Sequence, residues 1–318
     1  MCPKTIGVAA MGGDCNAVLE RIRRLEEMGI KAAWLTDGGV DMDALTLLAA
    51  AAVQTEEILL GTAIVPTWPR HPITMVQQTQ VLADLAPGRF RLGVGPSHRA
   101  EMEDIFGFDF QRPLTNLREY LKIVKALLQK GVVDFDGRHY RAHASTDQTA
   151  PDLPVMASAL RRASFKLCGA EADGAISWVC PGEYLRDVAL PAMQEGAKEA
   201  GRQAPPLITH AAVCVHDDPD EVRTAALEEL EYYPKSHFYQ RMFADAGFPE
   251  AEETGAWSDR MLDAVVLSGS EERVAEGLRR LFDWGATEVL ASVIEAGPSK
   301  QECWERTVRL LVGVSREL

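Results

Sequence analysis

The stretch that decides the fold spans residues 59–98 and reads LLGTAIVPTWPRHPITMVQQTQVLADLAPGRFRLGVGPSH. Residues 59–66 are mostly apolar and β-branched, and residues 90–94 form a second apolar run. Between them, residues 73–85 carry apolar side chains at helical spacing, and Pro87 and Gly88 end that helix. Two apolar strands joined by a helix make a βαβ unit, so the sequence predicts that these strands are parallel.

The same alternation of strand and helix continues on both sides of this unit. The further strands are predicted at residues 5–10, 32–36, 154–159, 174–179, 207–215 and 288–294. Helices are predicted at residues 17–28, 43–55, 114–129, 161–171, 182–199, 271–284 and 300–318, with Asp14 or Asn16 capping the first. About eight strands that alternate with helices are typical of a closed (β/α)8 TIM barrel, which we expect to form a single α/β domain over residues 1–318.

Two segments interrupt the alternation and are predicted as insertions. Residues 134–141, DFDGRHYR, read as a small hairpin, and residues 219–261 as a long, charged, partly aromatic helical region. The aromatic residues of that region suit either a lid over the site or an oligomer contact. An open dinucleotide-binding sheet is disfavoured, because AMGGD at residues 10–14 lacks the G-x-G-x-x-G pattern.

Composition excludes several classes of protein. The chain has 318 residues and a formal net charge of −14, which argues against a nucleic-acid surface and an anionic membrane patch. Six scattered cysteines without a C-x-x-C pair predict reduced thiols in the cytoplasm, and no segment is long and apolar enough to span a membrane. The opening residues MCPKTIGVAA lack the pattern of a signal peptide, so we expect none.

The residues just after the predicted strands should meet at one mouth of the barrel, where such folds place their chemistry. They are Asp37, His210 and residues 62–68, 95–98, 157–162 and 178–182. They include no H-E-x-x-H and no His/Asp cluster with metal spacing, so we expect no metal, and neither G-x-S-x-G nor a P-loop occurs. Small residues, aromatics and two arginines suit a large planar ligand that carries a phosphate and performs the chemistry itself.

At this point the sequence resembles a known family, the bacterial luciferase-like monooxygenase superfamily, and within it the reductases that use the deazaflavin coenzyme F420. The resemblance covers nearly the whole chain. It rests on GTAIVPTWPRHPITMVQQTQVLADLAPGRFRLGVGPSHR from Gly61, FGFDFQRPLTNLREYLKIVKALL from Phe106, PVMASALRRASFKLCGAEADGAISW from Pro154 and LSGSEERVAEGLRRLFDWGATEVL from Leu267. The S-H-R after the fourth strand is commoner in the F420 branch than among FMN monooxygenases.

The resemblance implies that coenzyme F420 lies across the barrel mouth, with its ring edge-on to strands two to four. It also implies a cis peptide bond between Ala63 and Ile64 beneath the ring, and a phosphate held where residues 157–162 lead into a helix. Many relatives have Gly-Pro where Arg161 and Arg162 stand here. The cofactor-binding residues so implied are Asp37, Thr62, Ala63, Ile64, Gly95, Ser97, Ala157, Ser158, Ala159, Leu160, Arg161, Trp178 and Val179.

His98 is the first candidate for a proton donor, because hydride delivery to a C=C or C=N bond needs a proton on the adjacent atom. Trp68 is the candidate for the wall of the substrate site. Relatives that act on glucose 6-phosphate carry a glutamate at the position of His98, which disfavours a sugar-phosphate substrate.

Each of these assignments has a plainer alternative. Asp37 and His98 could cap helices, and Arg161 and Arg162 could be solvated. Trp178 and His210 could be core residues, Trp68 could pack on the surface, and His71 more simply organises the start of its helix.

The functional expectation is therefore an F420-dependent oxidoreductase that transfers hydride between the deazaflavin C5 and a small organic substrate. The alternatives are an FMN-dependent luciferase-like monooxygenase and a non-catalytic flavin-binding barrel. A homodimer is expected from the resemblance, since dimers are common in the family, and we expect neither a nucleic-acid nor a membrane partner.

Overall fold

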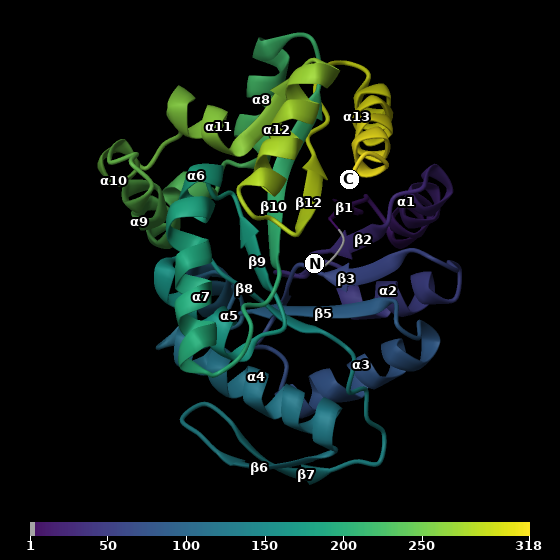
Figure 1. Ribbon diagram of the computed structural model, residues 1–318, viewed down its shortest axis with the longest axis vertical. Coiled ribbons are helices and arrows are strands. Elements are labelled where there is room, and N and C mark those ends of the chain that lie inside the picture. Colours follow the sequence, from purple (N-terminus) through teal and green to yellow (C-terminus); the bar gives the residue numbers. More distant parts are fainter. Residues whose placement is uncertain (1–3) are drawn as a thin grey trace.

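The computed structural model describes residues 4–318, and at its centre the parallel strands close into a barrel (Figure 1). The strands of the ring, in order, are β1 (Thr5–Ala9), β2 (Ala32–Leu35), β3 (Leu59–Thr62), β5 (Phe90–Gly95), β8 (Val155–Ser158), β9 (Ala175–Trp178), β10 (Leu207–Val215) and β12 (Glu288–Val293). The ring closes where β12 pairs in parallel with β1, with Glu288 opposite Thr5. The predicted TIM barrel is confirmed.

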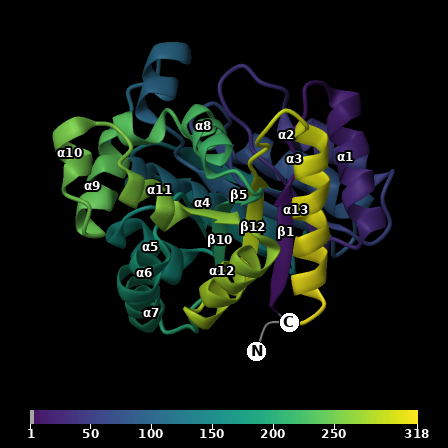
Figure 2. The same ribbon diagram turned by 90° about the horizontal axis from the view of Figure 1, so that it is seen from above.

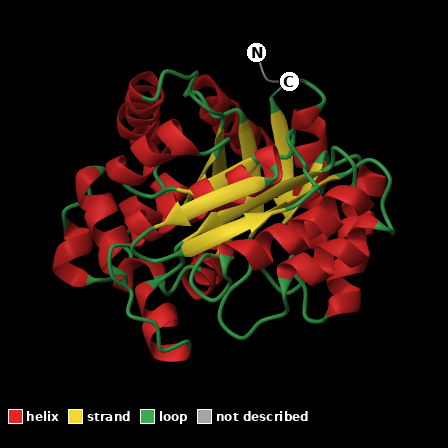
Figure 3. Ribbon diagram, turned by 90° about the horizontal axis from the view of Figure 1, so that it is seen from below, coloured by secondary structure: helices red, strands yellow, loops and turns green. Residues whose placement is uncertain are grey.

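Helices surround the barrel on all sides, as Figures 2 and 3 show. They are α1 (Cys15–Met28), α2 (Ala44–Ala52), α3 (Pro72–Leu85), α4 (Pro113–Lys130), α5 (Arg162–Glu171), α6 (Gly182–Tyr184), α7 (Leu190–Glu199), α12 (Glu271–Asp283) and α13 (Lys300–Ser315). Local sequence fixes their ends. Asp14, rather than Asn16, caps α1 by accepting the N–H of Ala17, and Gly29 ends α1 in the left-handed conformation.

The segment after β2 departs from the prediction in one respect, because residues 59–66 do not form one continuous strand. β3 ends at Thr62, and β4 (Val65–Pro66) resumes beside β5. The peptide bond between them, Ala63–Ile64, is cis, as the resemblance implies. The Thr62 hydroxyl both donates to the carbonyl of Gly93 and accepts its N–H, at 2.8 Å each, so β3 stays joined to β5 up to the break.

Both predicted insertions are present. The hairpin of β6 (Val132–Asp136) and β7 (Arg141–Ser145) lies outside the barrel, below α4 in Figure 1, and the Glu119 carboxylate accepts three backbone N–H groups of its turn. The helical insertion contains α8 (Pro219–Glu229), η3 (Tyr233–Lys235), α9 (His237–Asp245), α10 (Glu250–Thr254) and α11 (Asp259–Val265).

One strand was not predicted from the sequence. β11 (Val266–Gly269) pairs in parallel with the second half of β10, where β10 has already separated from β9 at His210. Four half-buried residues without alternation carry no strand signal of their own, so only pairing with β10 defines this element.

Two shorter segments also differ in detail from their predictions. The helical turn expected at residues 98–106 is a π-helical turn, η1 (Glu101–Ile105). The helix expected at residues 182–199 runs as α6 and α7 with a π-helical segment, η2 (Leu185–Ala189), between them. Within residues 4–318, no helix is long and apolar enough to cross a membrane. Cys2 lies outside the described residues, and the other five cysteines are free thiols.

Candidate functional site

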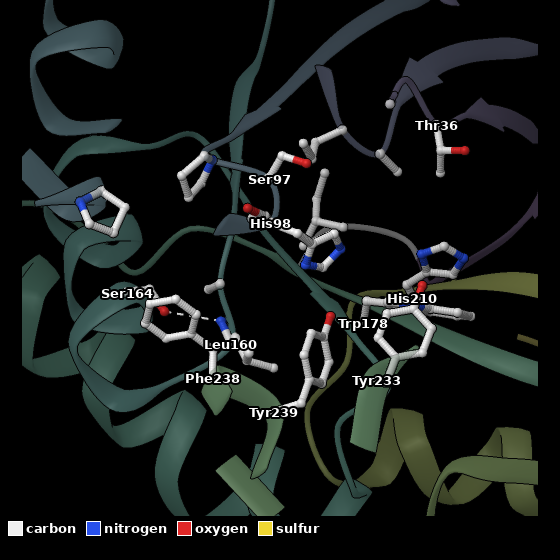
Figure 4. A pocket seen from close by; sticks show the side chains of 18 of the residues that line it. Thr36, Ser97, His98, Leu160, Ser164, Trp178, His210, Tyr233, Phe238 and Tyr239 are labelled. Carbon is white, nitrogen blue, oxygen red and sulfur yellow. Dashed lines mark hydrogen bonds between the residues drawn. The ribbon is translucent and has the colours of Figure 1, made fainter. Parts of the chain in front are cut away.

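A cavity of about 710 Å³ opens at the carboxyl ends of the barrel strands. Its floor is apolar and built of compact side chains: Ala9, Ala63, Ile64 and Ile176. Tyr233, Phe238 and Tyr239 of the helical insertion line the opposite side (Figure 4). The insertion therefore covers the mouth of the barrel. Of the two roles considered for its aromatic residues, a lid and an oligomer contact, this position supports the lid.

The structure brings most of the expected site residues into this one cavity. Those that line it are Asp37, Ala63, Ile64, Ser97, His98, Ser158, Ala159, Leu160, Arg161 and Trp178. Thr62, Gly95, Ala157 and Val179 lie directly behind them, fully or almost fully buried.

Trp68 lies elsewhere. Its ring packs against Phe108 and His139, and against Phe110 at 5.3 Å between centroids. Trp68 was predicted to form a wall of the substrate site. In the structure Phe110 lines the cavity, and Trp68 packs against Phe110 without lining the cavity itself.

Close packing at the ends of β5, β8 and β9 shapes the floor and the rim. A side chain on Gly95 would place its Cβ 2.2 Å from the Ser158 hydroxyl, so β5 and β8 approach closely there only because that residue is glycine. Ser97, which follows β5, and Val179, which follows β9, have φ angles of 59° and 52°, in the left-handed region that non-glycine residues seldom adopt. Such conformations are held in place by their surroundings and occur preferentially at functional sites.

Asp37 forms the acidic side of the cavity, and Arg70 holds it. The guanidinium of Arg70 lies 3.0 Å from the Asp37 carboxylate and also pairs with Asp43. Burial raises the pKa of Asp37, while Arg70 opposes that rise. Asp43, not Asp37, caps α2 by accepting the N–H of Thr46. Asp37 is therefore free of the capping role that the sequence left open for it.

A second carboxylate orders the loop after β5. Glu101 accepts the Ser97 hydroxyl at 2.6 Å and the backbone N–H of Gly39. It thereby ties the loop after β5 to the loop after β2 across the mouth. Glu101 was not predicted as a site residue, because it lies in a short acidic segment, EMEDI, whose charges are typical of a solvated surface.

His98 stands in an aromatic surrounding. Its ring packs edge-on against Tyr232 at 4.8 Å between centroids, with Tyr233 and Tyr239 at 6.2 and 6.1 Å. Burial lowers the pKa of His98, although the charge of Glu101 partly opposes this. The imidazole is therefore neutral at neutral pH and able both to donate and to accept a hydrogen bond.

The loop between β8 and α5 folds around one serine. The hydroxyl of Ser164 accepts the N–H groups of Leu160 and Arg161, each at 3.0 Å, and donates to the carbonyl of Arg161. The amino end of α5 then faces the cavity, since Ala163 and Ser164 line it. A helix amino terminus with N–H groups directed at a cavity favours an anion.

The two arginines of this loop do not add free positive charge. Arg161 pairs with Asp245 of α9 at 3.1 Å, and Arg162 pairs with Glu195 of α7. Both arginines are therefore held in ion pairs. The capacity of the loop to bind an anion rests instead on its backbone N–H groups and hydroxyls.

Replacing Ser164 by Ala is expected to lower the free energy of unfolding by about 0.5–2 kcal/mol, as loss of a helix cap does. The reason is that two N–H groups lose their acceptor at the edge of the cavity. Urea denaturation measures the change. Thr224→Ala serves as control, because that exposed hydroxyl bonds only to a carbonyl of its own helix. Equal losses in the two variants would contradict the assigned role of Ser164.

His210 is a residue whose position the sequence left undecided. It is buried, its Nε2 lies 2.7 Å from the Ser292 hydroxyl, and its ring stacks on Trp178 at 4.0 Å. It is therefore a satisfied buried histidine and also lines the cavity. Burial lowers its pKa to about 3, so it stays neutral and supports Trp178 as part of the wall.

Comparisons with known proteins agree with this architecture. The family model for luciferase-like monooxygenases matches residues 1–288. The 5,10-methylenetetrahydromethanopterin reductase of Methanolobus tindarius is 24% identical over 329 residues, which cover 97% of this chain and 100% of that protein. The F420-dependent glucose-6-phosphate dehydrogenase of Mycobacterium avium is 31% identical over 265 residues, covering 79% and 78%. The structure of the coenzyme F420-dependent tetrahydromethanopterin reductase from Methanopyrus kandleri superposes with a TM-score of 0.77 at 22% identity, covering 99% of both chains.

Proposed function

The chain belongs to the luciferase-like monooxygenase family, and from that premise we propose that it is a coenzyme F420-dependent oxidoreductase acting on a small organic substrate. The observation that carries the proposal is the cavity of about 710 Å³ at the barrel mouth, apolar on its floor and bounded by a helix amino terminus at one side. That volume is within the usual range for a site that buries a cofactor-sized ligand. The relatives named for F420 use support the choice of cofactor.

The residues present fit a flat ring with an anionic substituent. Ala63 and Ile64 offer the ring a surface without polar groups, beside Ala9 and Ile176. The amino end of α5 and the hydroxyl of Ser158, which has no hydrogen bond within residues 4–318, suit the phosphate. When bound, F420 supplies two-electron hydride chemistry at its C5 atom, and the chain's own residues orient the partners and manage the proton.

We assign proton transfer to and from the substrate to His98. Its side chain reaches the cavity beside Ser97, and its neutral imidazole can accept the proton of a substrate hydroxyl or, once protonated, return it. Arg70 and Glu101 hold the loops around the ring site, and the lid tyrosines exclude water from it.

The cofactor assignment is tested by titrating the purified protein with F420 and, separately, with FMN. We expect F420 to bind with a dissociation constant in the micromolar range, typical of ligands at working concentrations, and FMN to bind far more weakly. Selective binding of FMN together with oxygen consumption would replace this proposal by an FMN monooxygenase. Binding of neither would leave a non-catalytic barrel.

A charge substitution at Ser158 tests the phosphate end. Ser158→Asp is expected to weaken F420 binding by at least about tenfold relative to Ser158→Asn, because two like charges a few ångströms apart repel by more than about 1 kcal/mol in a half-buried site. Asn has the size of Asp without its charge, so the pair isolates electrostatics. Equal affinities for the two variants would place the phosphate elsewhere.

A further inference from the structure

One polar group in the cavity has no use in the site described so far, the hydroxyl of Tyr239. The Tyr239 side chain is only 6% exposed, and within residues 4–318 its hydroxyl makes no hydrogen bond. Figure 4 shows this hydroxyl directed into the cavity, toward the ring of His98. The side chain is buried while its hydroxyl opens onto the cavity, so a ligand atom placed there meets a donor that has no partner in the protein.

The neighbouring tyrosine does not share this property. The hydroxyl of Tyr233 interacts with the side chain of Trp178, and its ring packs on Tyr239 at 4.9 Å between centroids. Tyr233 therefore helps to fix the orientation of Tyr239, and of these two tyrosines it is Tyr239 that presents a donor without a protein partner to the cavity.

From this arrangement, and resting on the proposed function, we propose that Tyr239 and His98 together bind the heteroatom of the reacting group. The substrate class is then an uncharged carbonyl or imine in the reduction direction, and the corresponding alcohol or amine in the reverse direction. The Tyr239 hydroxyl donates a hydrogen bond to that oxygen or nitrogen, and the adjacent imidazole of His98 faces the same atom from beside the hydroxyl.

The charges of the lining favour an uncharged group. The cationic side chains that line the cavity, Arg161 and Arg162, are both paired with carboxylates. The carboxylate of Asp37 is paired with Arg70, and that of Glu101 is bound by a hydroxyl and an N–H group. Among the described lining residues, an anionic substrate would find no arginine or lysine without a carboxylate partner. Of the two remaining carboxyl groups in the lining, Asp41 is exposed, and burial raises the pKa of Glu229, which favours its uncharged form.

The same hydroxyl suits the chemistry of the reaction. Negative charge develops on the heteroatom when its carbon gains hydride, and a preorganised donor stabilises that charge more than it stabilises the ground state. Burial raises the pKa of Tyr239 well above its usual range, so the hydroxyl keeps its proton at every physiological pH and acts purely as a donor.

The proposal is tested first by binding, without the cofactor. The probes are cyclohexanone, cyclohexanecarboxylate and cyclohexylammonium, which share one ring and differ in charge, and ligand-observed NMR measures their affinities for the wild type. We expect cyclohexanone to bind most tightly. Tyr239→Phe should weaken it about two- to tenfold, the value of one hydrogen bond. Tyr232→Phe is the control, because Tyr232 also packs on His98 but does not line the cavity, and it should change affinity less than twofold.

A second measurement compares the wild type with the same variant. The infrared carbonyl stretch of bound ¹³C-labelled cyclohexanone should lie at lower frequency in the wild type than in Tyr239→Phe, because a hydrogen bond weakens the C=O bond. In turnover, Tyr239→Phe should reduce kcat by about 10²- to 10³-fold with little change in KM, as removal of an oxyanion donor does. Equal carbonyl frequencies in the two proteins, tighter binding of the anion or the cation, or an unchanged Tyr239→Phe variant would overturn the proposal.

F420 affinity, measured separately on the same proteins, keeps the two proposals apart. If F420 does not bind but cyclohexanone binding depends on Tyr239, the cofactor assignment fails and the heteroatom site stands. If F420 binds tightly to both the wild type and Tyr239→Phe while the carbonyl probe ignores Tyr239, the heteroatom site fails and the cofactor assignment stands.

Discussion

His98→Gln is expected to lower kcat/KM by about 10²- to 10⁴-fold in both directions of the reaction, the range associated with loss of a general acid–base group. The imidazole lines the cavity, and Gln retains hydrogen-bonding ability without a proton that titrates near neutral pH. Because Gln is close in size, the affinity for F420 should change little, so the loss should lie in the chemical step. The measurement is the rate of F420 reduction or oxidation with any substrate that the wild type turns over.

The pH dependence of the rate tests the same role of His98, because the direction of the change differs between the two directions of the reaction. Burial lowers the pKa of His98 below its usual 6.5, while the facing charge of Glu101 limits that shift. In alcohol oxidation His98 must be neutral, so kcat/KM should fall as the pH drops through a value below 6.5. In carbonyl reduction His98 must be protonated, so the rate should fall as the pH rises through that same value.

A matched substitution separates this effect from general damage. His143→Gln changes an exposed histidine of the β6–β7 hairpin, which pairs with Asp134 and does not line the cavity. It should leave both rate and pH profile unchanged. An inflection that persists in His98→Gln would assign the titration to another group, and a rate equal to the wild type would remove His98 from the mechanism.

Glu288→Gln is expected to reduce the free energy of unfolding by about 3–5 kcal/mol, the loss seen when one partner of a buried ion pair is removed. Glu288 is 5% exposed at the start of β12, inside the barrel. Its carboxylate accepts the Trp34 indole N–H at 2.9 Å and two N–H groups of the Arg91 guanidinium at 2.5 and 3.1 Å. Arg91 also lies over the ring of Trp34, 4.2 Å from its centroid.

Glu295→Gln provides the control for that stability measurement by urea denaturation. The pair of Glu295 and Arg21 has the same chemistry, at 3.0 Å, but about a quarter of each side chain is exposed. Partly exposed pairs contribute about 0–1 kcal/mol, so this variant should stay close to the wild type. A double variant, Arg91→Met with Glu288→Met, should recover most of the loss, because it leaves no unpaired buried charge. Similar losses in the two single variants would contradict the view that burial makes the Glu288 pair essential.

The local sequence around residues 59–98 sufficed for the architecture, because apolar periodicity and the breaks at proline and glycine act over a few residues. The strand–helix alternation placed Asp37, Ser97 and His98 after consecutive strands, and the closed ring then brought these ends together. The hairpin at Asp136 and Gly137 followed from turn chemistry alone. The apolar periodicity of residues 59–66 did not predict the break between β3 and β4. Only the family resemblance implied an irregularity there, the cis peptide bond between Ala63 and Ile64.

Patterns of neighbouring residues were enough to predict the barrel, its insertions and the edge of the barrel at which the site lies. The folded structure was needed to show which charges remain available and which polar groups face the cavity. The pairing of Arg161 with Asp245 joins residues 84 positions apart, and Phe110, on which Trp68 packs, lines the cavity. The Tyr239 side chain of the helical insertion faces His98 of the loop after β5. Such contacts depend on how distant segments pack in three dimensions, which no local pattern of residue types records.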